Sequence, residues 1–369
     1  MSSTNTTTTT TTTNKDNTVT RKHNNVTPIK PVTKTTSTAG AVKPRAAFPK
    51  DSLKHLDKEA IQDLLKMHTY CRPAGSDTEK RFNARYIDCF NGVRIDEAGN
   101  RIITILNHDD TKPRILWSSH TDTVHSKDGT QKLVYGAGLL SLSSSADSSC
   151  LGADCTVGVW IMREMILRDI PGLYIFHAAE EVGGIGSRYI ATKTPELLDG
   201  IDYAIALDRR GTTSAITHQG SRCASDDFGN ALAAQLSTKD HTYKLDTGGT
   251  FTDTANYTDI VPECTNLSVG YYHAHSSAEY LDVTFAAYLL ERLCQLDVTT
   301  LPVSRKAGDD DGYYDSRFYS PSSYTPRYSS TNKTALEDLV YDNAYAAAQL
   351  LDEMGITADD FEQYILSIR

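Results

Sequence analysis

One stretch of this sequence, LYIFHAAEEVGGIGSRYI at Leu173–Ile190, constrains the fold more than any other. Its first part, Leu173–Ala179, is apolar and follows the turn-forming pair Pro171-Gly172. A short apolar run bounded in this way is typical of a buried strand. We therefore predict that Leu173–Ala179 is a strand in the interior of a sheet.

Two adjacent carboxylates, Glu180 and Glu181, end this strand. Parallel sheets bind their ligands at the carboxyl ends of the strands, and successive side chains of a strand point to opposite faces. The two glutamates can therefore have different roles, one binding a metal and the other transferring a proton. The alternative is structural, because a Glu pair followed by Gly183-Gly184 and a capping Ser187 also describes the solvated start of a helix.

Composition and charge exclude several classes of function. The net charge of the 369-residue chain is −10, but residues 1–50 contain eight Lys and Arg against one Asp, so the remainder carries −17. A body this acidic is a poor nucleic-acid binder, because phosphate contacts require Lys and Arg. No apolar run reaches the length of a membrane span. Seven scattered cysteines without a CxxC motif indicate free thiols, and we expect a cytoplasmic protein.

The composition also divides the chain into segments. Residues 1–48 form a basic, Thr-rich tail that has too little apolar surface to fold and is expected to be disordered. One large α/β domain is expected at residues 49–301. A flexible linker rich in Asp, Tyr, Ser and Pro follows at 302–332, and a pair of helices joined at Gly355 is expected at 333–369.

Predicted strands alternate with predicted helices along residues 49–301. This order is typical of a mixed, mostly parallel central sheet with helices on both faces. The strands are expected at Arg101–Leu106, Arg114–Ser119, Leu139–Leu142, Leu173–Ala179, Tyr203–Leu207, Ser214–Thr217 and Asn266–Val269, and the helices at Asp51–Thr69, Asp77–Phe90, Cys155–Arg168, Asp226–Leu236, Asp253–Tyr257 and Val283–Leu296.

Residues that can bind metal recur where predicted strands end or a helix begins. Each has an ordinary alternative; an Asp before a helix, for example, is commonly its N-cap. Together, two histidines and three carboxylates suit a pair of divalent zinc ions, and a carboxylate two residues after a histidine can accept its second ring N–H. The candidates, in chain order, are His120 with Asp122, Asp154, Glu180 with Glu181, Asp208, and His273 or His275.

Five motifs carry these residues: SSHTDTVH, LGADCTVG, HAAEEVGGIGS, ALDRRG and YYHAHSSAEYLD. They resemble the metal-site motifs of co-catalytic zinc exopeptidases, a superfamily that includes aminopeptidases of the S and Y types, peptidase T and carboxypeptidase G. The resemblance covers residues 51–296. It implies the zinc exopeptidase (phosphorylase/hydrolase-like) fold and a zinc-dependent metallopeptidase that hydrolyses peptides or small amides.

The resemblance also implies a role for each residue. Two Zn²⁺ ions, or other divalent cations such as Co²⁺ or Mn²⁺, would be held by five ligands, with His120 and Asp208 on different ions. Glu180 would be the general base, and Asp122 would orient the first histidine. The metal ligands implied are His120, Asp154 as the bridge, Glu181, Asp208 and His275.

Further expectations concern the neighbours of these ligands. The peptide bond between Asp154 and Cys155 should be cis, as the resemblance implies. Many members have a second acidic residue where this chain has Cys155. His275 is preferred to His273 because Glu279 follows it by four positions, as in the family, and that Glu should cap the loop rather than bind metal. His273 would then line a substrate pocket.

Spacing favours the compact aminopeptidase type. Only 33 residues separate His120 from Asp154, and 66 separate Asp208 from His275, so neither interval holds the extra domain of the larger branches. Three alternatives stay open. They are a carboxypeptidase or amidohydrolase with the same metals, a single-zinc enzyme similar to glutaminyl cyclase, and a non-catalytic binding module. Oligomeric state is left open.

Overall fold

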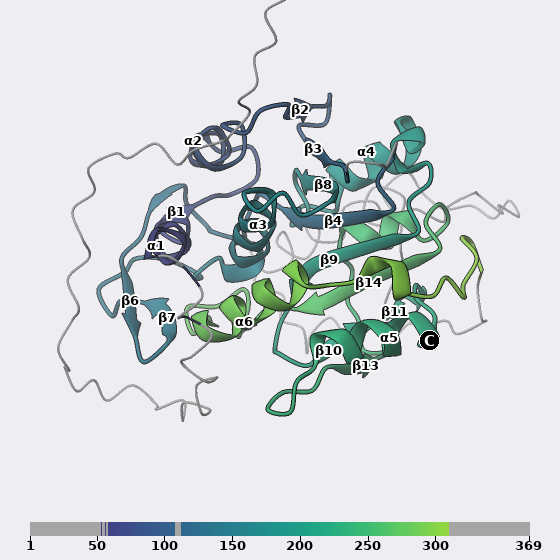
Figure 1. Ribbon diagram of the computed structural model, residues 1–369. Coiled ribbons are helices and arrows are strands. Elements are labelled where there is room, and N and C mark those ends of the chain that lie inside the picture. Colours follow the sequence, from purple (N-terminus) through teal and green to yellow (C-terminus); the bar gives the residue numbers. More distant parts are fainter. Residues whose placement is uncertain (1–52, 54–55, 57, 108–111, 310–369) are drawn as a thin grey trace, which may run out of the picture. The chain divides into compact units, whose positions relative to one another are not determined.

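The computed structural model describes residues 53, 56, 58–107 and 112–309 (Figure 1). The predicted Thr-rich tail and the predicted C-terminal helix pair lie outside the described residues. Among the described residues, no helix is both long and apolar enough to cross a membrane.

The central sheet has eight strands, and its four middle strands are all parallel. Four of its seven neighbouring pairs are parallel and three are antiparallel, so the predicted mixed, mostly parallel sheet is confirmed. The order across the sheet is β13 (Lys244–Asp246), β10 (Ser214–Ile216), β14 (Glu263–Ser268), β9 (Tyr203–Arg209), β4 (Ile115–His120), β8 (Gly172–His177), β3 (Arg101–Ile105) and β2 (Arg94–Ile95).

Helices cover both faces of this sheet, as the sequence predicted (Figure 1). The sheet separates two apolar cores. Successive side chains of β4 point to opposite faces, so that Trp117 packs into one core and Leu116 into the other. The first core is formed with α1 (Lys58–Met67), α2 (Asp77–Tyr86), α3 (Ala153–Ile166), α5 (Asp226–Leu236) and α6 (Val283–Cys294), and the second with α4 (Ile185–Lys193) and the short 3₁₀ helices η2 (Pro195–Leu198) and η3 (Asp253–Tyr257).

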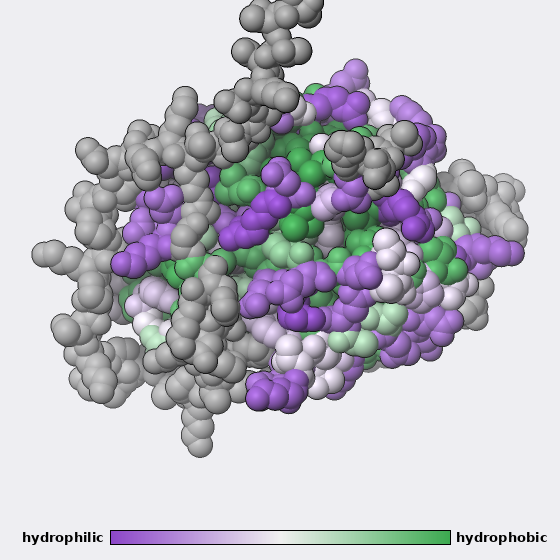
Figure 2. Space-filling view, in the orientation of Figure 1, coloured by the Kyte–Doolittle hydropathy of each residue, from purple (hydrophilic) through white to green (hydrophobic). Residues whose placement is uncertain are grey.

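Figure 2 shows hydrophilic residues along the right-hand and lower edges of the visible face, and hydrophobic residues nearer its centre. The strands at the middle of the sheet are buried along their whole length, as β4 and β8 illustrate. Near-continuous apolar strands of this kind are expected where a parallel sheet is covered on both faces.

Several short strands were not predicted. A second, four-stranded sheet contains β7 (Leu139–Leu142), which was predicted at these bounds, together with three strands that were not. Two of them have only two or three residues, too few to show a period-2 pattern. Besides β2 and β13 of the central sheet, the unpredicted strands are β6 (Leu133–Gly136), β15 (Tyr271–Tyr272) and β16 (Tyr280–Asp282) in this sheet, and the pairs β1 (Tyr70–Cys71) with β5 (Gly129–Thr130) and β11 (His218–Gln219) with β12 (Ser221–Arg222). A further 3₁₀ helix is η4 (Val298–Thr300).

The folded body continues past residue 301, where the linker was expected to begin. The backbone N–H groups of Ser304 and Arg305 donate to the buried carboxylate of Glu263 at 2.8 and 2.9 Å. Gly308 N–H donates to the carbonyl of Thr258 at 3.0 Å. Residues 302–309 are therefore packed on the domain, and the rest of the predicted linker lies outside the described residues.

Candidate metal centre

His120 is the last residue of β4, and its imidazole is 1% exposed. Register places it beside a candidate ligand of the next strand, because β4 and β9 are parallel and Ser118 pairs with Ala206. Asp208, two residues further along β9, is thus level with His120. Asp208 Oδ1 lies 3.4 Å from His120 Nε2.

The surroundings of the His120 ring favour a cation. Its Nδ1 lies 3.1 Å from the backbone oxygen of Asp122 and 3.4 Å from Oδ1 of the same residue, so Nδ1 carries the hydrogen. In a neutral ring the lone pair is then on Nε2. That atom faces Asp154 Oδ1 at 3.1 Å and Asp208 Oδ1 at 3.4 Å. Lone pairs would therefore face each other unless a proton or a metal ion lay between them.

A second group of ligand atoms lies on the other side of Asp154. His275 Nε2 is 3.2 Å from Asp154 Oδ2 and 3.3 Å from Glu181 Oε1. The contacts with the carboxylates of Asp154 and Glu181 raise the pKa of His275 to about 11. The His275 side chain is 51% exposed, so this group is open to solvent.

Asp154 is shared by the two groups. One carboxylate oxygen faces His120 and the other faces His275. This is the arrangement required of a carboxylate that bridges two ions, the role that the resemblance implied. His273, the alternative ligand, instead has its ring centroid 5.8 Å from that of Tyr280.

The geometry differs from the expectation that His120 and Asp208 hold different ions. Their side chains belong to the same group, and Glu181 and His275 form the other with Asp154. The reason is the strand order, because β4 and β9 are neighbours. The sequence does not show which strands are adjacent, so it could not reveal this pairing.

Two buried carboxylate oxygens support the fit of this site to metal ions. Within the described part of the chain, Glu181 Oε1 and Asp208 Oδ1 are buried and have no hydrogen-bond partner. Glu181 Oε1 lies 3.3 Å from His275 Nε2, and Asp208 Oδ1 lies 3.4 Å from His120 Nε2. Buried carboxylates without a donor are costly unless they are paired or bind a metal. Imidazole and carboxylate are common zinc ligands, and the donor set fits two divalent ions.

The Glu pair lies in a turn beyond the end of β8, not on the strand as predicted. Its position is fixed by Asp122, whose two oxygens accept the N–H groups of Glu180 and Glu181, each at 3.1 Å. Burial raises the pKa of Glu180 well above its ordinary value, while His120 opposes this shift. Ser187 is not the helix cap, since Gly184 is the N-cap of α4 and the Ser187 hydroxyl accepts from Asn256.

Glu279 connects the loop of His275 to the bridging residue. Its carboxylate is 1% exposed and accepts the N–H groups of Gly152, Ala153 and Asp154 at 2.8, 3.0 and 3.2 Å. Negative charge at a helix N-terminus is stabilising, and α3 begins here. The expected capping role is therefore present. The expected cis peptide bond between Asp154 and Cys155 is also present.

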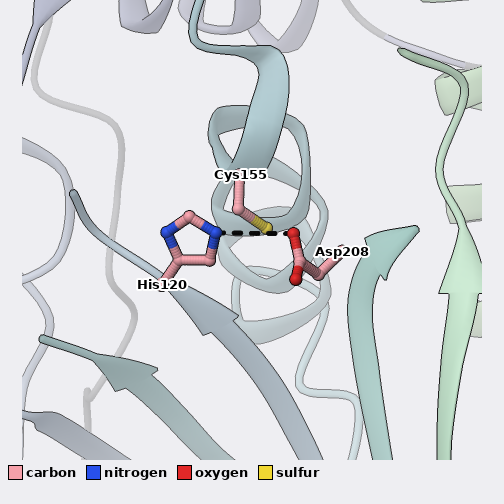
Figure 3. A group of neighbouring side chains, drawn as sticks. All are labelled: His120, Cys155 and Asp208. Atoms are coloured by element: carbon pink, nitrogen blue, oxygen red, sulfur yellow. Dashed lines mark ion pairs between the residues drawn. The ribbon is translucent and has the colours of Figure 1, made fainter. Parts of the chain in front are cut away.

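The thiol of Cys155 lies beneath the first group. Figure 3 shows its sulfur between the His120 ring and the Asp208 carboxylate. Burial raises the pKa of this thiol well above its ordinary value. In the sequence, Cys155 was notable only as a departure from the family pattern. Its place directly after the bridging Asp was the available signal.

A buried pair behind the site was also missed. His177, which is paired with His120 across β4 and β8, lies 3.3 Å from Asp253 Oδ2 through its Nδ1. Its Nε2 is 2.7 Å from the hydroxyl of Tyr257. The signal was a histidine at the end of an otherwise apolar strand.

No protein-family model and no curated protein sequence matches the chain. Solved structures similar to it include the aminopeptidase PepT from Bacillus cereus, at 15% identity and TM-score 0.48, covering 65% of this chain and 98% of that one. The TET1 peptidase of Pyrococcus horikoshii has 18% identity and TM-score 0.46, with coverages of 64% and 97%. The LapA aminopeptidase of Legionella pneumophila has 16% identity and TM-score 0.46, with coverages of 71% and 75%.

Proposed function

We propose that this chain is a zinc-dependent metallopeptidase, an aminopeptidase that removes N-terminal residues from peptides. The observation that carries the proposal is the position of Asp154, whose two oxygens face the Nε2 atoms of two different histidines. A bridging carboxylate between two imidazoles suits a pair of divalent ions better than one. His120 and Asp208 would hold one ion, Glu181 and His275 the other, and Asp154 both.

When bound, such ions lower the pKa of water to about 7 and polarise a carbonyl group. The chain's own contribution to the reaction is the general base. Glu180 takes a proton from the attacking water and later delivers it to the leaving amine. Burial favours the proton-bound state of Glu180, which suits a group that must hold and return a proton.

Positioning of this base is built into the backbone. Asp122 accepts the N–H groups of both Glu180 and Glu181, and its backbone carbonyl accepts from His120. Asp122 therefore fixes the proposed base and one proposed ligand of each ion, His120 and Glu181. Such supporting contacts orient metal ligands and tune their basicity.

The substrate test uses the full chain loaded with zinc. A free aminoacyl amide, its N-acetylated counterpart and a peptide with both termini free are incubated with the protein, and products are identified by mass. An aminopeptidase cleaves the first and third and leaves the N-acetylated amide intact. Shortening from the carboxyl end would identify a carboxypeptidase, and hydrolysis of N-acyl amides an amidohydrolase.

A single-zinc enzyme and a binding module would each give a different result. Release of ammonia with cyclisation of an N-terminal Gln, at one zinc per chain, would identify an enzyme similar to glutaminyl cyclase. Binding of peptides without turnover of any would identify a non-catalytic module.

The four-segment organisation and a cytoplasmic location complete the proposal. All seven cysteines are free thiols, which supports a reducing compartment.

A further inference from the structure

Cys155 occupies a position from which its sulfur can reach a metal ion. The residue is fully buried and immediately follows the bridging Asp154. Its Sγ lies 2.8 Å from Ser119 Oγ and 3.0 Å from the backbone oxygen of Leu207. These two residues immediately precede His120 and Asp208, so the sulfur lies directly beneath the two ligands.

The three side chains form one compact donor set. One ligand atom from each of His120, Cys155 and Asp208 lies within 4.8 Å of the others. In Figure 3 the sulfur lies between the imidazole and the carboxylate, beside the line that joins His120 Nε2 to Asp208 Oδ1. Asp208 Oδ1 has no hydrogen-bond donor among the described residues. A cation placed among these atoms would satisfy it.

We propose that the sulfur of Cys155 is an additional ligand of the ion held by His120 and Asp208. The inference rests on the proposed two-zinc function and adds a nitrogen, sulfur and oxygen donor set to one of its sites. The thiol gives up its proton to solvent as the sulfur–zinc bond forms. Thiolate is a soft ligand that favours zinc over manganese or magnesium.

Buried polar contacts order the residues next to the sulfur. Arg72 is fully buried, and its guanidinium donates to Thr156 Oγ1 and to the backbone oxygen of Thr121, both at 2.8 Å. These acceptors are neutral, and they belong to the residues next to Cys155 and His120. The Ser119 hydroxyl, already 2.8 Å from the sulfur, can donate to it.

X-ray absorption at the zinc edge distinguishes sulfur from lighter ligands, because zinc–sulfur bonds are about 2.3 Å and zinc–nitrogen or zinc–oxygen bonds about 2.0–2.2 Å. The full chain is loaded with two zinc ions and measured as wild type, Cys155→Ser, Cys223→Ser and Cys89→Ser. Cys223 is a buried control away from the site, and Cys89 is an exposed thiol that could bind zinc adventitiously.

The wild type should show a sulfur shell of about half an atom per zinc, because one of the two ions binds one sulfur and the signal is averaged over both. Cys155→Ser should lose this shell, while both control variants keep it. Wild-type protein with two zinc ions and only light ligands would overturn the inference, whether or not the variant folds. A sulfur shell that survives in Cys155→Ser would do the same.

The proposed function is tested separately by the same preparation. Turnover with two zinc ions but without a sulfur shell leaves the peptidase proposal intact and removes only this ligand. A chain that binds no zinc contradicts both.

Discussion

The carboxylate of Asp122 accepts the backbone N–H of Glu180, with Oδ1 3.1 Å from the nitrogen. Its second oxygen accepts from Glu181 in the same way, and its backbone oxygen accepts from the His120 ring. The turn after β8 is thus held to the end of β4 by a single side chain. Asp122 therefore controls the geometry of the proposed base as well as that of a ligand.

Replacing Asp122 by Asn should reduce turnover by about 10–100-fold, because an amide offers one acceptor where two are needed. Its NH₂ group would face a backbone N–H. Zinc content and kcat measured together on the full chain check this. Asp147→Asn, a change at an exposed side chain, is the matched control and should behave as wild type. Unchanged kcat in Asp122→Asn would show that the contact does not matter for the reaction.

Replacing Glu180 by Gln should reduce kcat at least about 100-fold while leaving bound zinc near the wild-type amount. The reason is that the proposed base acts on water and not on metal. Glu181→Gln should instead lose zinc. Elemental analysis and steady-state kinetics on both variants measure the difference. Equal zinc loss in the two, or an active Glu180→Gln, would refute these roles.

His275→Ala should lose one zinc ion per chain, whereas His273→Ala should keep both. Of these two histidines, His275 is the one whose Nε2 lies close to Asp154 and Glu181. Zinc counted after gel filtration decides between them. Loss of metal from His273→Ala alone would transfer the ligand to that residue.

Glu279→Gln should lower the free energy of unfolding of the metal-free chain by about 2 kcal/mol. Three buried N–H groups share the Glu279 carboxylate, and an amide cannot accept from all of them. Urea unfolding without metal measures this contribution separately from zinc binding. Glu196→Gln, on the exposed surface, is the control. Equal urea midpoints in the two variants would show that the Glu279 hydrogen bonds do not stabilise the chain.

Residue patterns along the chain were sufficient for much of the fold. The strands β4, β8 and β9 are buried on both faces, which requires apolar residues along their whole length. Their apolar runs could therefore be predicted as interior strands from composition. Helix α5 was predicted at its observed bounds, and the structure shows Ser225 as its N-cap. Strands β15 and β16 were missed because two or three residues carry no period.

The candidate site was predicted residue by residue, but its pairing was not. Each candidate ligand lies near the end of a predicted strand or the start of a predicted helix, which is local information. That His120 faces Asp208 depends on β4 lying beside β9. This neighbourhood of strands is not local information, so the sequence does not reveal it. The same limit applies to Asp122, whose contact with the Glu turn joins two strands. Cys155 gained its significance only from the residues that surround it in space.

The central claim is that two metal ions share Asp154 and support peptide hydrolysis. Its most direct measurement is a titration of the metal-free full chain with zinc, in which bound zinc and turnover of an aminoacyl amide are recorded at each point. We predict that binding saturates at two zinc ions per chain and that full turnover requires both. Full turnover in the metal-free chain, or saturation without any turnover, would contradict the claim.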